Sequence, residues 1–238
     1  MASPGDHVRW FAEKQGWRIS RCNVVTEGEI DTRYFVLADR LYASRHRQRL
    51  ITEDLAVFPV GTGLNGGAFK VAATFPTFRQ IIDADLGENS QILFRAIALL
   101  DNDPIGQEAY ESITTRCVNI RGGRDVFLLA RSFPRNERMP GGYNAAIVNA
   151  NKKWASLTCE IEDLLTLELV HAFLKANGIE PSKCMQTTEG AYHVELDTSS
   201  KGKLFEFCEQ NAKLEDIARI IELLKSLRFF LGLPVPSS

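Results

Sequence analysis

The sequence predicts an α/β protein in which a mostly parallel sheet is flanked by helices and followed by a C-terminal α+β extension. Two observations predict this fold class. Short runs of continuous apolar residues alternate with segments whose apolar residues recur at helical spacing. Strands that are apolar along their whole length suit a parallel sheet that is covered on both faces. The chain has 238 residues and 45% hydrophobic content, which is enough for a substantial core.

Each of the first three predicted strands is followed by a predicted helix. The strands are expected in residues 22–28, 55–63, 92–100 and 125–132. The helices are expected in residues 31–45, 68–83 and 104–115. The second helix should be interrupted at Pro76, because proline inside a helix removes a hydrogen bond. In such sheets, ligand chemistry gathers beyond the carboxyl ends of the strands.

The composition changes after residue 131. We therefore divide the chain into a core, residues 1–131, and an extension, residues 132–238, within one compact unit. Residues 132–154 are rich in Gly, Pro, Asn and basic side chains, which predicts a long surface loop. The elements expected after it are a strand running into a helix at 157–165, a helix at 166–178, a half-buried strand at 190–198 and a helix with an apolar stripe at 214–234.

Bulk properties argue against several classes of protein. The net charge is -2 and the pI is near 6.1, so no overall positive field attracts nucleic acid. The five cysteines are scattered without C-x-x-C spacing, which argues against a disulfide framework or a zinc ribbon. The chain opens without a signal-peptide pattern and has no apolar run of roughly 18 residues. We expect a cytoplasmic protein that does not engage a membrane.

Acidic residues follow two of the predicted strands. Asp101 and Asp103 come after the third strand, and Glu27 and Asp31 come after the first. Two carboxylates side by side repel each other, and the positive charge of a divalent cation relieves that repulsion. Mg²⁺ is suited to this position because it prefers oxygen ligands. The alternative for each acid is structural. Asp103 before Pro104 resembles a helix N-cap, Asp31 is a second candidate N-cap, and Glu27 is a turn residue.

These two segments resemble the signatures of a known domain. "TEGEIDTRYF" resembles the E-G-x-x-D signature, and "LLDNDPIGQEA" the D-x-D-x-x-G signature, of the TOPRIM domain of topoisomerases, primases and certain nucleases. Gly106 falls on the glycine of the second signature, and "VFPVGTGLNGG" resembles the glycine-ended strand that lies between the two. The resemblance covers roughly residues 20–131 and implies that residues 1–131 form a TOPRIM catalytic core.

The extension resembles that of one branch, the overcoming-lysogenization-defect (OLD) nucleases. "CEIEDLL", with Glu160, Glu162 and Asp163, is similar to their second acidic segment. "SSKGKLFEFCEQN" is similar to their closing segment, whose functional lysine would be Lys203 or Lys201. The chain departs from this branch because it has no P-loop, so any ATPase would have to be a separate partner.

The resemblance implies a Mg²⁺-dependent endonuclease that cleaves phosphodiester bonds in DNA or RNA. It implies two ions, for which Mn²⁺ can substitute, and general acid/base work for Glu27. Lys203 or Lys201 would neutralise developing charge. The ligands implied are Glu27, Asp31, Asp101, Asp103, Glu160, Glu162 and Asp163. The basic loop with Arg131, Arg135 and Arg138 is expected to contact the nucleic-acid backbone, unless it is an ordinary solvated loop.

Several alternatives stay open. The chain could be the effector of a bacterial anti-phage or toxin-like system, a ribonuclease specific for tRNA, or a catalytically silent subunit of an ATPase complex, and it could form homo-oligomers. A haloacid-dehalogenase-like phosphatase is disfavoured because Ile105 stands where that motif needs Thr or Val. The glycines Gly61, Gly63 and Gly66 fit G-x-G-x-x-G, but no acid at the end of the next strand is free for a ribose, since Asp101 lies about forty residues on, twice the separation of a dinucleotide fold.

Overall fold

The computed structural model describes residues 3–63, 66–135, 141–180 and 185–236. Its strands are β1 (Cys22–Thr26), β2 (Leu55–Pro59), β3 (Arg95–Leu100), β4 (Val126–Leu128), β5 (Met185–Thr188) and β6 (Ala191–Val194). Its α-helices are α1 (Asp6–Gln15), α2 (Glu29–His46), α3 (Ala68–Ala84), α4 (Pro104–Arg116), α5 (Gly142–Asn151), α6 (Leu167–Ala176), α8 (Thr198–Asn211) and α9 (Ala218–Phe230). Short 3₁₀ helices are η2 (Glu88–Ser90), η3 (Lys152–Trp154), η4 (Ile161–Leu164) and η5 (Glu215–Ile217).

The predicted α/β fold is confirmed. Strands β1 to β4 form one parallel sheet in the order β2-β1-β3-β4. Strands β5 and β6 form a separate antiparallel hairpin in the extension. Because β1 and β3 are direct neighbours and parallel, the segments that follow Thr26 and Leu100 emerge at the same edge of the sheet. We call this the carboxyl edge.

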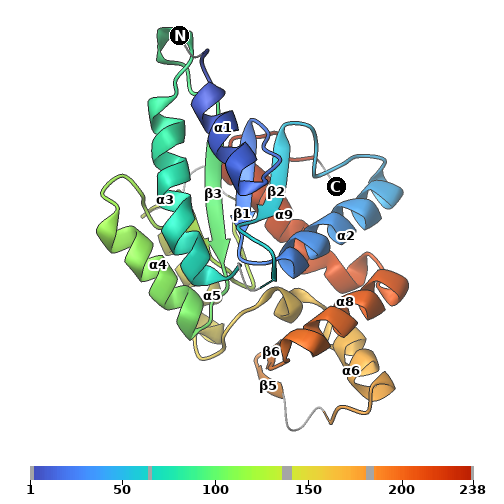
Figure 1. Ribbon diagram of the computed structural model, residues 1–238. Coiled ribbons are helices and arrows are strands. Elements are labelled where there is room, and N and C mark those ends of the chain that lie inside the picture. Colours follow the sequence, from blue (N-terminus) through green and yellow to red (C-terminus); the bar gives the residue numbers. More distant parts are fainter. Residues whose placement is uncertain (1–2, 64–65, 136–140, 181–184, 237–238) are drawn as a thin grey trace.

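Helices cover both faces of the sheet (Figure 1). Val24 packs in a core formed with α2, α6, α8 and α9, whereas its neighbour Val25 packs in a second core formed with α1, α3 and α4. Both valines are 0% exposed, as expected for a strand whose successive side chains point to opposite faces. The first core contains residues from both sides of position 131, so the extension packs directly against the sheet and α2.

The structure corrects three local predictions. Helix α3 is not interrupted at Pro76, because Phe75 and Phe78 are fully buried on either side of it and their packing offsets the missing hydrogen bond. Residues 132–154 are not a single loop, since α5 begins after Gly141 and buries Ile147. Residues 157–165 form one isolated bridge, at Cys159, and the 3₁₀ helix η4 in place of a strand and an α-helix. Among the described residues, no helix is both long and apolar enough to cross a bilayer.

A carboxylate far along the chain anchors the first helix. Asp85, at the C-cap of α3, accepts backbone hydrogen bonds from Gly5, His7 and Val8 at 2.8, 3.0 and 3.1 Å. These donors are the unsatisfied N–H groups at the start of α1. Burial alone would raise the pKa of Asp85, but the three N–H groups outweigh it and lower the pKa. The charged carboxylate therefore stabilises the docking of α1.

We expect Asp85→Ala to lower the free energy of unfolding by about 3 kcal/mol, because it leaves buried donors unpaired. The stabilisation is present above the unfolded-state pKa of about 3.9 and is lost as the pH falls through the lower folded-state pKa. Urea denaturation at several pH values measures both effects. Asp83→Ala is the control, since the Asp83 side chain is 44% exposed and pairs with Arg79 instead of with a backbone N–H of α1. Equal losses in the two variants would contradict the anchoring role.

Candidate acidic site at the carboxyl edge of the sheet

The ends of β1 and β3 meet through a side chain. Glu27, directly after β1, accepts a hydrogen bond at its Oε1 from the backbone N–H of Asp101, directly after β3, at 2.8 Å. Residues that are 74 positions apart in the chain are thereby fixed at one point. The expectation that these two acids share the carboxyl edge is confirmed by this contact.

Asp31 and Asp103 stand beside them in local helix-capping roles. Asp103 is the N-cap of α4, and its Oδ1 accepts the N–H of Gly106 at 2.6 Å. Asp31 is not an N-cap, because that position belongs to Gly28, whose N–H donates to Asp31 Oδ2 at 3.0 Å. Both carboxylates are only partly buried. Capping holds each of them near Glu27, whose pKa responds to both charges.

A bridge brings the second acidic segment to the same edge. Asn102 and Cys159 exchange two backbone hydrogen bonds, of 2.8 and 3.1 Å, so the chain after Cys159 runs beside the end of β3. An isolated two-residue bridge leaves no pattern in a sequence, and nothing in the chain indicated it. It places Glu160 and Glu162 near the first acids, and we call the combined set the acidic cluster. The acidic cluster comprises Glu27, Asp31, Asp101, Asp103, Glu160 and Glu162.

Burial and like charge raise the pKa values of four acids of the cluster, namely Glu27, Asp31, Asp101 and Glu162. Burial, and then the charges of Asp31 and Asp103, raise the pKa of Glu27 to about 7. Burial raises the pKa of Asp31 to about 6 and that of Glu162, which is 2% exposed, to about 8. Burial, joined by the charges of Asp31 and Glu27, raises the pKa of Asp101 well above its usual value. Such a cluster gains free energy by taking up a proton or a cation.

Lys201 supplies a positive charge to the acidic cluster. It lies near the start of α8, and its Nζ is 2.8 Å from Glu160 Oε2. Burial alone would lower the pKa of Lys201, but Glu162 and the ion pair with Glu160 outweigh burial and raise it. The carboxyl groups whose pKa values its charge lowers are those of Glu27, Asp31, Asp101 and Glu162. Lys203 is exposed and acts instead on Asp197, so of the two lysines Lys201 is the one that faces the site.

Asp163 does not join the acidic cluster. It is 0% exposed, and its Oδ2 accepts the N–H of Glu160 and faces His193 Nδ1, both at 2.9 Å. Its Oδ1 accepts the N–H of Val194 at 3.1 Å. The carboxylate therefore ties the 160–163 turn to the hairpin. The expectation that it is a metal ligand is corrected, because its oxygens are already committed to these partners.

Of the three arginines expected to contact nucleic acid, the structure excludes Arg131. The Arg131 side chain is 2% exposed and donates to the carbonyls of Thr158 and Tyr192, so it cannot reach a ligand in solvent. Arg135 forms an exposed ion pair with Glu222 at 2.6 Å, and its contact with nucleic acid stays a prediction. Arg138 lies outside the described residues.

The acidic cluster has the donor atoms of a divalent-metal site, but its side chains are not arranged as one. The donors are carboxylate oxygens, which are the ligands that Mg²⁺ prefers. Among the described residues, however, no three acidic, histidine or cysteine side chains converge closely enough to hold an ion. Lys201 already forms an ion pair with one of these acids, Glu160. Metal binding would thus require side-chain rotation at the partly exposed acids, with the backbone already in place.

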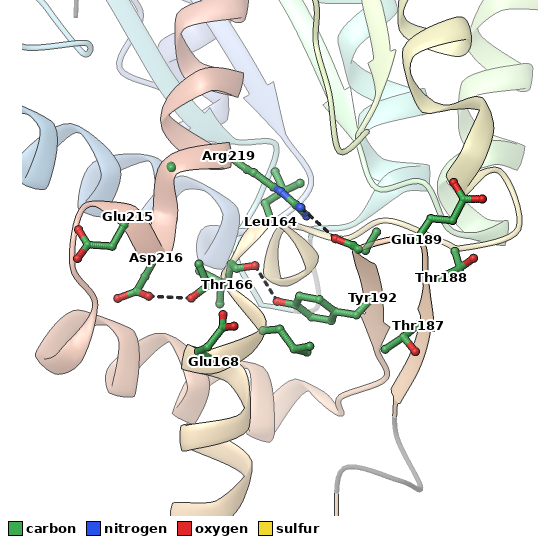
Figure 2. A pocket seen from close by; sticks show the side chains of 15 residues that line it. Leu164, Thr166, Glu168, Thr187, Thr188, Glu189, Tyr192, Glu215, Asp216 and Arg219 are labelled. Atoms are coloured by element: carbon green, nitrogen blue, oxygen red, sulfur yellow. Dashed lines mark hydrogen bonds between the residues drawn. The ribbon is translucent and has the colours of Figure 1, made fainter.

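A cavity of about 680 Å³ lies beside the β5–β6 hairpin (Figure 2). It is enclosed by η4, α6, the β5–β6 hairpin and η5, and no residue of the acidic cluster lines it. Figure 2 shows Glu168, Glu215 and Asp216 along one side and Glu189 across from them. Arg219 also lines the cavity, which is separate from the acidic cluster.

Comparisons with protein-family models, with curated proteins and with solved structures found no match for this chain.

Gly106 permits the tight approach of α4 to the site. A Cβ at this position would lie 1.9 Å from the backbone oxygen of Asp101, which cannot rotate away. We expect Gly106→Ala to cost about 1–3 kcal/mol of stability, as overpacking does, and to displace the N-cap. Gly202→Ala is the matched control, because a Cβ there meets nothing within 4 Å and alanine favours the helix by about 1 kcal/mol. The melting temperature should fall for Gly106→Ala and rise for Gly202→Ala. A shift in the same direction for both variants would contradict this account.

Proposed function

We propose that this chain is a metal-dependent endonuclease of the TOPRIM type that hydrolyses phosphodiester bonds in nucleic acid. One observation carries the proposal: the hydrogen bond from Asp101 to Glu27, which joins the ends of two parallel strands inside a cluster of desolvated acids. The resemblance of the segments around Glu27 and Asp101 to the two TOPRIM signatures supports it independently.

The side chains suit the separate tasks of phosphodiester hydrolysis. Glu27, with a pKa near 7, can accept or return a proton near neutral pH. Bound Mg²⁺ or Mn²⁺, held by the acidic cluster, would supply charge neutralisation on the phosphate and an activated water. Lys201 would stabilise negative charge that develops on the transferred phosphate, since its charge already acts on the acids that face it.

The substrate and setting follow from the same proposal. The acidic cluster is suited to DNA or RNA, including tRNA, because the phosphodiester is common to them. We further propose a cytoplasmic effector, in an anti-phage or toxin-like system, that works with a separate ATPase or as a homo-oligomer. Incubation of the purified chain with Mg²⁺ or Mn²⁺ and plasmid, single-stranded DNA or tRNA tests the activity and identifies the substrate.

A second candidate function is a catalytically silent subunit of the same fold. The ion pair between Lys201 and Glu160 favours it, because an ammonium group among the acids competes with a metal ion. The two candidates differ in metal binding and in cutting. A chain that neither binds Mn²⁺ nor cuts any substrate, and that co-purifies with an ATPase, is the silent subunit.

We expect Glu27→Gln and Asp101→Asn each to reduce metal-dependent cleavage at least a hundredfold, the usual scale for removing an acid/base group. Glutamine still has an oxygen that can accept the Asp101 N–H, so the strand ends should stay joined. Calorimetric titration with Mn²⁺ should show weaker binding in both variants. Asp163→Asn is the contrasting variant, since it should lower stability and leave Mn²⁺ affinity unchanged. Normal cleavage by Glu27→Gln would refute the proposed chemistry.

The two lysines give a second, sharper comparison. Lys201→Met should lower the cleavage rate about a hundredfold, because it removes a charge that lies among the acids and that would face the reacting phosphate. Lys203→Met changes the same kind of side chain two positions away and should cleave at the wild-type rate, because Lys203 is exposed and faces Asp197. Rates measured at saturating Mg²⁺ separate this effect from metal affinity. A larger loss of cleavage rate in Lys203→Met than in Lys201→Met would assign the catalytic role to Lys203 instead.

A further inference from the structure

Two large apolar side chains are exposed beside the acidic cluster. Phe69 is 55% exposed and lies in the first turn of α3, and Ile105 is 53% exposed and lies in the first turn of α4. The two helices pack against each other, and both begin at the carboxyl edge of the sheet (Figure 1). Leaving a phenylalanine half in water forgoes hydrophobic stabilisation, and here it happens next to the candidate site.

Backbone contacts fix both first turns to the site. The N–H of Gly67, the N-cap of α3, donates to the backbone oxygen of Glu27 at 2.9 Å, which places Phe69 two residues from that contact. Ile105 is likewise two residues from Asp103, the N-cap of α4. The position of these apolar groups relative to the acidic cluster is therefore set by hydrogen bonds within the fold.

The first turn of α3 contributes a positive charge beside Phe69. Lys70 follows Phe69 and is exposed, and the first turns of α3 and α4 contain no acidic residue. An exposed aromatic ring beside a cation is the combination that binds single-stranded nucleic acid, because bases stack on the ring while the cation pairs with phosphate. Duplex DNA offers no free base faces along its length, so it could use only the cation.

We propose that Phe69, with Lys70 and Ile105, forms a stacking platform for an unpaired base next to the phosphate at the acidic cluster. The preferred substrate is then single-stranded DNA or RNA, or an unpaired segment within a duplex. This inference rests on the proposed function for its account of the phosphate. The stacking contact itself requires only that the chain binds nucleic acid at this edge.

The test measures binding without cutting. The full chain carrying Glu27→Gln, in Mg²⁺, is titrated into a fluorescently labelled single-stranded oligonucleotide of about twelve mixed bases, and anisotropy gives the Kd. Adding Phe69→Ala should weaken binding roughly tenfold or more, and Phe69→Trp should restore it. Adding Lys70→Ala should weaken binding less than Phe69→Ala does. It should also lower the slope of log Kd against log salt concentration by about one, as expected for one lost phosphate contact. Thermal unfolding confirms that each variant is folded.

Trp10→Ala is the matched control. Trp10 is 60% exposed, like Phe69, but lies on α1, the helix that Asp85 anchors at the opposite end of α3. Its loss should leave binding unchanged. No measurable binding of the single strand, or equal Kd values for the parent and the Phe69→Ala variant, would overturn the platform, as would duplex bound as tightly as single strand with the same dependence on Phe69.

The outcome also separates this inference from the proposed nuclease. If the wild-type chain cuts nucleic acid but Phe69→Ala leaves binding unchanged, the nuclease stands and the platform fails. If single strands bind through Phe69 and the wild-type chain cuts nothing in Mg²⁺ or Mn²⁺, the platform stands and the nuclease fails.

Discussion

The candidate site depends on one hydrogen bond between the ends of two neighbouring parallel strands. The N–H of Asp101 has no strand partner beyond the end of β3, and the Glu27 carboxylate accepts it. The bond fixes a carboxylate where burial opposes its charge, which raises its pKa towards neutrality. The N–H of Asp101 and the charge of Lys201 offset part of that penalty. The proposed chemistry follows from this balance between desolvation and compensation.

Structural and chemical roles coincide at this edge. Asp103 caps α4, and Asp31 accepts the N–H of Gly28 at the start of α2. Both carboxylates are partly buried and lie close enough to Glu27 for their charges to raise its pKa. Asp163 is the contrasting case. It also accepts a turn N–H, but it is fully buried and directed at the hairpin, and it serves the fold alone.

Local signals predicted the parts of the protein that local physics decides. Continuous apolar runs predicted the four parallel strands, because a strand covered on both faces must be apolar along its length. Asp103–Pro104 predicted a helix start, because proline at the first helical position has no N–H that would be left unpaired. The errors arose where packing overrides local preference. Pro76 lies inside an unbroken helix, and Ile147 anchors a helix within a stretch whose glycines and asparagines indicated a loop.

The sequence by itself determined that acids follow strands and that these strands belong to a parallel sheet, which is enough to place Glu27 and Asp101 at one edge. Only the tertiary structure decided which of the later residues joins them. The bridge between Asn102 and Cys159 delivers Glu160 and Glu162, and the direction of α8 selects Lys201 over Lys203. Arg131 appeared to be a surface cation and is buried against carbonyl groups. Spacing along a chain encodes periodicity within an element, whereas the approach of distant elements depends on the packing of the whole core.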